Sequence, residues 1–353
     1  DFNRRDFLIK CSKVFGLTAI SNLYFSSVFA SCHQINKIKA AKSEDQKKYL
    51  VEKLETSAKI DSQIYYFTGT GNSLAIARNL SNKIGANLIS IPTIIDREII
   101  SINSNIAGIV FPVYHKSIPL ILKRFVEQVD WSEVKYIFAV CTFGDSVGVA
   151  IKDIRELIEV NGGELRAGFG IHMPYNYLTP TFTLRDFYGS FTIREVSIKK
   201  QKSLIKKSAE KINKITGYIQ NRQTGKYEVS YKPLTRLADA LNLEESMGKS
   251  SWLKIAGVKE DTDLSFIESR QLMDKAFRAD DNCTSCGACV QICPVDNIAL
   301  SNNKPEWLNR CEQCFACLHW CPEQAIQFGD NTAGRKRYHH PDIKLADMIK
   351  QAS

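Results

Sequence analysis

One stretch of the chain decides its fold: Ile64-Tyr65-Tyr66-Phe67-Thr68-Gly69-Thr70-Gly71-Asn72-Ser73. It begins as a short apolar run typical of a buried strand, and apolar residues then recur at helical spacing at Leu74, Ala77 and Leu80. Between strand and helix the chain turns through glycines and hydroxyl residues. Such a turn directs backbone N–H groups and the positive end of the helix at one point, where the hydroxyls add further donors. The stretch therefore predicts an anion site at residues 68–73.

Further strand and helix patterns alternate after this turn. Four more apolar runs predict strands, at 87–91, 106–111, 137–140 and 166–171. Helical patterns separate the later strands, at 117–129 and 147–160. Alternating units with near-continuous apolar strands predict an α/β fold with a doubly wound parallel sheet. Because ligands of such sheets bind beyond the carboxyl ends of the strands, the loops after the third and fourth strands are expected to face the ligand.

The turn at residues 68–73 resembles the phosphate loop of flavodoxins, which holds the 5′-phosphate of FMN without a metal. It contains neither the Gly-Lys-Ser/Thr of a Walker loop nor Gly-x-Gly-x-x-Gly. An ordinary tight turn between strand and helix is the alternative. The resemblance implies a flavodoxin-like domain with FMN as cofactor, held by residues after three strands: Thr68, Gly69, Thr70, Gly71, Asn72, Ser73, Pro112, Tyr114, Thr142, Phe143 and Gly144.

Individual roles at the flavin follow from the same resemblance. It implies ring contacts for Tyr114 and Phe143 and a close backbone approach at Gly144. The alternative for either aromatic residue is ordinary packing within its loop. His115 is a candidate donor to a flavin oxygen, with a solvated loop histidine as the alternative. Cys141, at the end of the fourth predicted strand, is interpreted as a small buried hydrophobe.

The cysteines are concentrated near the C-terminus. Eleven occur in the chain, and eight of them form two identical runs: Cys283-x-x-Cys286-x-x-Cys289-x-x-x-Cys293-Pro294 and Cys311-x-x-Cys314-x-x-Cys317-x-x-x-Cys321-Pro322. A disulfide scaffold would distribute cysteines through a small secreted chain, so this clustering predicts metal ligation. Two zinc sites are the alternative, but structural zinc normally uses two separated Cys-x-x-Cys pairs.

Each run resembles the signature of bacterial two-cluster ferredoxins, in which three close thiolates bind one corner of a [4Fe–4S] cubane. In that family the fourth cysteine of each run ligates the other cluster. The resemblance implies two [4Fe–4S] clusters in a small α+β domain. One ligand set would be Cys283, Cys286, Cys289 and Cys321, and the other would be Cys311, Cys314, Cys317 and Cys293.

Positive charge is concentrated in one segment. The chain has a formal net charge of +9, and residues 194–236 contain twelve Lys or Arg against three Asp or Glu, which is the same surplus of nine. Apolar spacing predicts a helix over 193–220, with a stripe at Val196, Ile205, Ala209, Ile212, Ile215 and Ile219. Its opposite face is rich in lysine and is either a solvated surface or a docking face for acidic redox proteins. No helix-turn-helix, zinc finger or aromatic-interleaved patch accompanies the lysines, so nucleic acid is not an expected partner.

The N-terminus resembles a twin-arginine export signal. Asn3-Arg4-Arg5-Asp6-Phe7-Leu8-Ile9-Lys10 precedes an uncharged stretch that ends at Val28-Phe29-Ala30 with residues suited to a signal peptidase. The resemblance implies export of a folded protein to the periplasm or the outer membrane face. An amphipathic helix or an uncleaved anchor is the alternative, with cytoplasmic location if no export occurs. No other segment is expected to cross a membrane.

These features predict a fusion of a flavodoxin-like domain with a two-cluster ferredoxin domain. The expected segments are a signal (1–32), a charged spacer (33–60), the flavodoxin-like FMN domain (61–222), a linker (223–278), the ferredoxin domain (279–330) and a basic tail (331–353). The tail is expected to be solvated, or else to form a packed strap. The expected function is electron transfer between FMN and the clusters. The alternative is an FMN and iron–sulfur oxidoreductase that reduces a small molecule at the flavin.

Overall fold

The computed structural model describes residues 60–97, 100–176, 196–229, 253, 257, 266–330 and 332–352. The chain divides between residues 60 and 61, and the fold below belongs to residues 61–353, with the first strand starting at Ile60. The expected signal at 1–32 and the rest of the expected spacer lie outside the described residues. Among the helices that the structure describes, none is long and apolar enough to cross a membrane.

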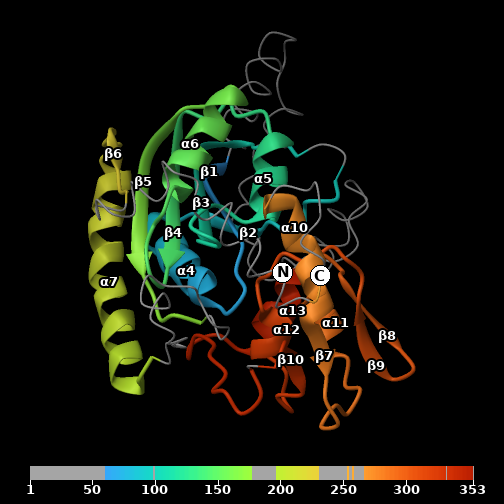
Figure 1. Ribbon diagram of the computed structural model, residues 1–353. Helices are drawn as coiled ribbons and strands as arrows, with labels where there is room; N and C mark the ends of the chain where they lie inside the picture. Colours follow the sequence, from blue (N-terminus) through green and yellow to red (C-terminus); the bar gives the residue numbers. More distant parts are fainter. Residues whose placement is uncertain are drawn as a thin grey trace, which may run out of the picture. The chain divides into compact units, whose positions relative to one another are not determined.

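A six-stranded sheet forms the centre of the first part of this unit (Figure 1). Its strands are β1 (Ile60–Tyr66), β2 (Asn87–Ser90), β3 (Ser104–Pro112), β4 (Tyr136–Phe143), β5 (Leu165–His172) and β6 (Lys226–Tyr227). They lie in the order β2-β1-β3-β4-β5-β6, and the pairs β1–β2, β3–β4, β4–β5 and β5–β6 are all parallel. The direction of winding reverses between β1 and β3, which is the topological switch of a flavodoxin-like sheet. The predicted fold class is therefore confirmed.

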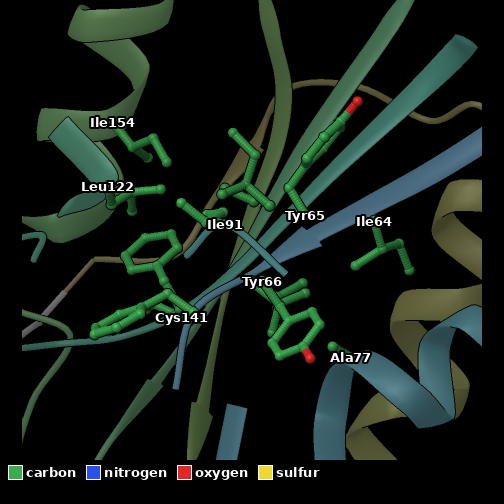
Figure 2. Packing of buried hydrophobic residues seen from close by; sticks show 14 of the residues in the cluster. Ile64, Tyr65, Tyr66, Ala77, Ile91, Leu122, Cys141 and Ile154 are labelled. Carbon is green, nitrogen blue, oxygen red and sulfur yellow. The ribbon is translucent and has the colours of Figure 1, made fainter. Parts of the chain in front are cut away.

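Helices cover both faces of the sheet (Figure 1). They are α4 (Asn72–Ile84), α5 (Leu120–Glu127), α6 (Ala150–Val160) and α7 (Ile198–Gln220). α4 packs beside α7, and α5 packs beside α6. Successive strand residues point to opposite faces, so Ile64 points toward the side of Ala77 on α4, whereas the Tyr65 ring packs 5.1 Å from that of Phe125 on α5 (Figure 2).

Some element boundaries differ from the sequence expectation. α5 begins at Leu120, after Pro119, whose extended backbone cannot belong to the helix. α7 begins at Ile198 because the Ser197 side chain caps it by accepting a hydrogen bond from the Lys200 N–H. The buried stripe of α7 also includes Leu204 and Ser208, whereas Ala209, which was expected in that stripe, is exposed. β6 was not predicted, and it extends the sheet beyond residue 222.

The cysteine-rich part is a small α+β fold. α10 (Phe266–Leu272) and a 3₁₀ turn (Met273–Ala276) lead into β7 (Phe277–Ala279), which pairs antiparallel with β10 (Ile326–Phe328). β8 (Ile298–Ser301) and β9 (Lys304–Trp307) form a hairpin, and α11 (Ala288–Ile292) and α12 (Ala316–His319) each follow the first cysteines of a run. The rings of Phe277, Phe315 and Phe328 pack together as its core.

The C-terminal segment is packed rather than solvated. Its side chains at Tyr338, His340, Ile343 and Met348 are buried, and the chain ends in α13 (Leu345–Ala352). Ile343 and Met348 join the same apolar core as the six-stranded sheet. Of the two expectations for this segment, the structure shows the packed strap, and residues 338–348 are called the strap below.

Candidate redox site

The glycine-rich turn joins β1 to α4 at the topological switch of the sheet. Gly71 is the N-cap of α4 and has a φ of 88°, a left-handed conformation that favours glycine. No side chain caps this helix end, and its first turn contains no acidic residue. The N-terminal N–H groups and the positive end of the helix dipole therefore suit an anionic group such as a phosphate.

Hydrogen bonds hold the side chains of the turn in place. The Thr68 Oγ1 accepts from the Gly71 N–H at 3.1 Å, and the Thr70 Oγ1 accepts from the Asn176 Nδ2 at 2.6 Å. The Ser73 hydroxyl lies 2.8 Å from that of Thr142, at the carboxyl end of β4. Pro112, the last residue of β3, pairs in register with Thr142. The structure thus brings the predicted residues after β1, β3 and β4 together.

Phe143 and Gly144 continue from β4 along the same edge of the sheet. The Phe143 ring is stacked on that of His172, with centroids 5.3 Å apart and planes 3° apart. The His172 Nε2 lies 3.0 Å from the Gly144 carbonyl oxygen, and Tyr175 packs against Gly144. His172 and Tyr175 were not among the predicted site residues, although both follow the fifth predicted strand, whose carboxyl end lies at the same edge of the sheet.

Tyr114 and His115 face the cysteine-rich part. The Tyr114 hydroxyl lies beside Gly69 and Cys314. The His115 Nε2 lies 2.6 Å from the Gln313 Oε1, and burial lowers the pKa of His115 to about 3, so the imidazole is neutral at physiological pH. His115 is therefore not the solvated loop histidine considered above, because it is held against the second cysteine run.

The first predicted ligand set surrounds one cavity. Cys283, Cys286, Cys289 and Cys321 line it, and it encloses about 330 Å³, including the part open to solvent. Three of these cysteines come from the first run and one from the second. Cys286 is exposed and Cys289 is buried, and burial raises the pKa of Cys289 to about 11. This cavity, called cavity 1, therefore lies at the protein surface.

The second set surrounds a cavity of about 310 Å³, called cavity 2. Cys293, Cys311, Cys314 and Cys317 line it, and all four are buried. Burial raises the pKa of Cys314 to about 12, and it raises those of Cys311 and Cys317 as well. Burial thus favours the neutral thiols, and the iron of a cubane would supply the positive charge that four buried thiolates around one cavity require.

Backbone N–H groups already contact two of these sulfurs. The Asn297 N–H donates to the Cys293 Sγ, and the Gln313 N–H donates to the Cys311 Sγ, both at 3.2 Å. Hydrogen bonds to sulfur adjust the reduction potential of an iron–sulfur cluster. The donors, the cavity and the interleaved cysteines together fit a cubane.

Cys314, which lines cavity 2, lies against the glycine-rich turn. The Trp320 Nε1 donates to the Gly69 carbonyl at 3.1 Å, and both Cys314 and the Tyr114 hydroxyl approach the same glycine. On the sheet side, the buried Glu312 carboxylate accepts from the Ile121 N–H at 2.9 Å and pairs with Arg124 at 2.9 Å. Burial raises the pKa of Glu312, and Arg124 opposes this rise by stabilising the carboxylate. Neither Trp320 nor Glu312 was predicted from the sequence, although Trp320 directly precedes Cys321 and Glu312 directly follows Cys311.

The strap closes another side of the turn. The Tyr338 hydroxyl donates to the Asn72 Oδ1 at 2.7 Å, and the His340 N–H donates to the Thr70 carbonyl at 2.9 Å. Ile343 packs against Gly71. The glycine-rich turn is thus held by the cysteine-rich part and the strap together.

One family model matches the chain. Residues 282–326 match a 4Fe-4S dicluster domain. The match covers both cysteine runs and supports iron–sulfur ligation over the zinc alternative. The chain therefore contains a 4Fe–4S domain at its C-terminal end, joined to a flavodoxin-like sheet.

Several solved structures are similar to parts of the chain, all at low identity. Rubredoxin oxygen:oxidoreductase from the anaerobe Desulfovibrio gigas is 15% identical, over 49% of this chain and 41% of that chain, with a TM-score of 0.31. A flavodoxin from the domain Archaea is 16% identical, over 43% of this chain and 99% of that chain, with a TM-score of 0.27. An FMN-dependent NADH-azoreductase from Bacillus anthracis str. Ames Ancestor, in complex with FMN, is 8% identical, over 45% of this chain and 99% of that chain, with a TM-score of 0.30. At these scores the fold assignment rests on the strand order of the sheet itself. No curated protein matches the chain.

Proposed function

We propose that this protein transfers electrons between a flavodoxin-type FMN and two [4Fe–4S] clusters. The turn at residues 68–73 would hold the FMN phosphate, and the cysteines of cavities 1 and 2 would hold the clusters in the two interleaved sets. Bound FMN exchanges two electrons, singly or together, and each cubane exchanges one. The role of the chain is then to bring these groups close together and to set their potentials.

One observation carries the proposal: a buried cysteine of cavity 2 lies against the glycine-rich turn, whereas cavity 1 has an exposed cysteine. Cys314 of cavity 2 is in contact distance of Gly69, and Cys286 of cavity 1 is exposed. A cluster with an exposed ligand is accessible to a redox partner, and a cluster whose buried ligand lies beside the turn is close to the expected flavin phosphate. This arrangement supports a relay better than two independent binding sites.

Cofactor analysis of anaerobically purified protein tests the proposal. We expect iron and sulfide in the amount of two cubanes and one releasable FMN. Cys314→Ala should lose the iron of one cubane, because it removes a ligand from cavity 2. Cys141→Ala is the matched control and should retain all iron, since Cys141 is buried in β4 outside both sets. Wild-type protein without FMN would refute the flavin assignment, and full iron content in Cys314→Ala would refute the ligand set.

We also propose that acidic redox proteins dock on the lysine face of α7. Lys199, Lys202, Lys206, Lys207 and Lys214 are exposed on this helix. A positive surface of this kind raises the encounter rate with an acidic partner. Charge reversal on α7 should therefore slow electron exchange with such a partner.

Export through the twin-arginine route is a further proposal, motivated by Asn3 to Lys10. A protein that must assemble its clusters before translocation fits a route that carries folded proteins. Cell fractionation of the wild type and of the double variant Arg4→Lys, Arg5→Lys tests it. Export of both proteins alike would contradict the proposal.

A further inference from the structure

The Tyr114 hydroxyl is a buried polar group without a hydrogen bond among the described residues. The loop after β3 presents it to the cysteine-rich part, and its ring packs edge-on against Phe67, with centroids 6.2 Å apart. Leaving a buried hydroxyl unpaired is costly, so a native structure normally supplies a partner. The partner of Tyr114 must therefore be sought in what surrounds the hydroxyl.

Cys314 is the candidate that approaches the same glycine as the Tyr114 hydroxyl. A Cβ atom placed on Gly69 would lie 2.6 Å from the Tyr114 hydroxyl oxygen and 3.1 Å from the Cys314 Cβ. Both side chains therefore lie against the same glycine, in the space that a side chain at residue 69 would occupy. A phenol keeps its proton at neutral pH, and the sulfur of a coordinated thiolate has none, so between these two groups the Tyr114 hydroxyl is the donor.

A second donor approaches cavity 2 from another element. The Trp307 Nε1, at the end of β9, is also buried without a hydrogen bond of ordinary geometry among the residues that the structure describes. It faces Cys317, where it opposes the rise in the pKa of that thiol. Two buried donors from separate elements thus lie beside cysteines of the same cavity.

We propose that the Tyr114 hydroxyl donates a hydrogen bond to the Cys314 sulfur of the loaded cluster in cavity 2 and raises its reduction potential. This inference rests on the proposed ligand set of cavity 2. Reduction adds negative charge to a cluster held by four thiolates, and a donor stabilises the more negative state more strongly. Tyr114 is then a positioning residue that lets the flavodoxin-like part adjust a cluster bound by the other part.

The test is an EPR-monitored titration with dithionite under anaerobic conditions, on the full chain with its clusters. Tyr114→Phe removes the donor and keeps the ring. At the ambient potential that half-reduces the cavity 2 cluster of the wild type, the ratio of reduced to oxidised cluster in the variant should be about five- to tenfold lower. This change corresponds to roughly half the free energy of a charge-assisted hydrogen bond. The ratio of reduced to oxidised form of the cavity 1 cluster should be unchanged. A Cys283→Ala background keeps only the second ligand set complete and identifies its signal.

Tyr65→Phe is the matched control. Tyr65 is also a buried tyrosine of the sheet, but its hydroxyl donates to the Gln63 Oε1 at 2.8 Å, so its loss should leave both clusters unchanged. If Tyr114→Phe shifts the flavin alone, or neither cluster, the inference is wrong, and in the first case Tyr114 is the ring contact that the flavodoxin resemblance implied.

A second substitution keeps the test decisive if Tyr114→Phe does not fold. Replacing Tyr114 by 3,5-difluorotyrosine makes the hydroxyl a stronger donor, so the same ratio should rise rather than fall. An unchanged ratio in that protein overturns the inference. Wild-type protein without iron contradicts the proposed function itself, whereas loaded protein with unshifted ratios contradicts this inference alone.

Discussion

At the scale of single residues, Gly69 shows how closely the two parts of the chain approach each other. A Cβ at this position would overlap the Cys314 main chain and the Tyr114 hydroxyl. The Cys314 main chain belongs to the second cysteine run and Tyr114 to the loop after β3, so neither can easily move away. We expect Gly69→Ala to lower the free energy of unfolding by about 1–3 kcal/mol, as other overpacked positions do. Urea-induced unfolding followed by tryptophan fluorescence measures this change.

Gly217 provides a matched control for that substitution. It lies within α7, and no atom lies within 4 Å of the position that a Cβ would occupy. Gly217→Ala should therefore raise the free energy of unfolding by roughly 0.5–1 kcal/mol through helix propensity. Equal effects of the two substitutions would show that Gly69 is not a contact between the parts.

Residue by residue, the sequence predicts what is local and misses what is distant. The turn at 68–73 follows from its local pattern, and its closeness to the loop after the fourth strand follows from strand order, because parallel strands end at one edge of the sheet; the contact of Ser73 with Thr142 agrees with this. Trp320 on Gly69 and Tyr338 on Asn72 could not be predicted. These partners lie 251 and 266 positions apart, and no periodicity in the sequence connects them. The expected roles at the flavin for Tyr114 and Phe143 remain predictions.

At the scale of elements, agreement depends on the strength of the local pattern. Strands β1 to β5 were predicted because each is an apolar run long enough to be recognised. β6 has two residues and pairs only at the sheet edge, so its apolar signal is too short to separate from a loop. The strap was ambiguous because its buried side chains at Tyr338, His340 and Ile343 alternate with polar residues.

The lysine face of α7 leads to a prediction about one element. Lys202→Glu with Lys206→Glu should slow electron exchange with an acidic redox protein several-fold at low salt, because steering by surface charge is lost. The salt dependence of the rate should also flatten. Stopped-flow kinetics with an acidic ferredoxin or flavodoxin as partner measures both.

Two exposed lysines on other helices serve as the control. Lys123 on α5 and Lys152 on α6 each form an i,i+4 ion pair, with Glu127 and Glu156. Reversing both changes the net charge by the same amount as the α7 variant. If the control slows exchange as much as the α7 variant does, net charge rather than a docking face is responsible.

At the scale of the whole molecule, the two parts share one apolar core. Ile292, Ala316 and Trp320 of the cysteine-rich part, with Ile343 and Met348 of the strap, belong to the same buried cluster as the sheet. The ion pair of the buried Glu312 with the partly exposed Arg124 adds a polar connection, and separating it would leave the Glu312 carboxylate without its partner. The sheet and the cysteine-rich part are therefore expected to unfold together.

Removal of iron tests this coupling. Because metal binding to cysteine sites contributes folding free energy, chelation should destabilise the cysteine-rich part, and through the shared core it should destabilise the sheet as well. We expect calorimetry to show one transition for the loaded protein and a single transition at lower temperature after anaerobic treatment with a chelator. Far-UV circular dichroism, which reports mainly on the sheet and its helices, should follow the same shift. A sheet transition that stays in place after iron removal would show that the parts fold independently, and the contacts at Gly69 would then serve only to position the two sites.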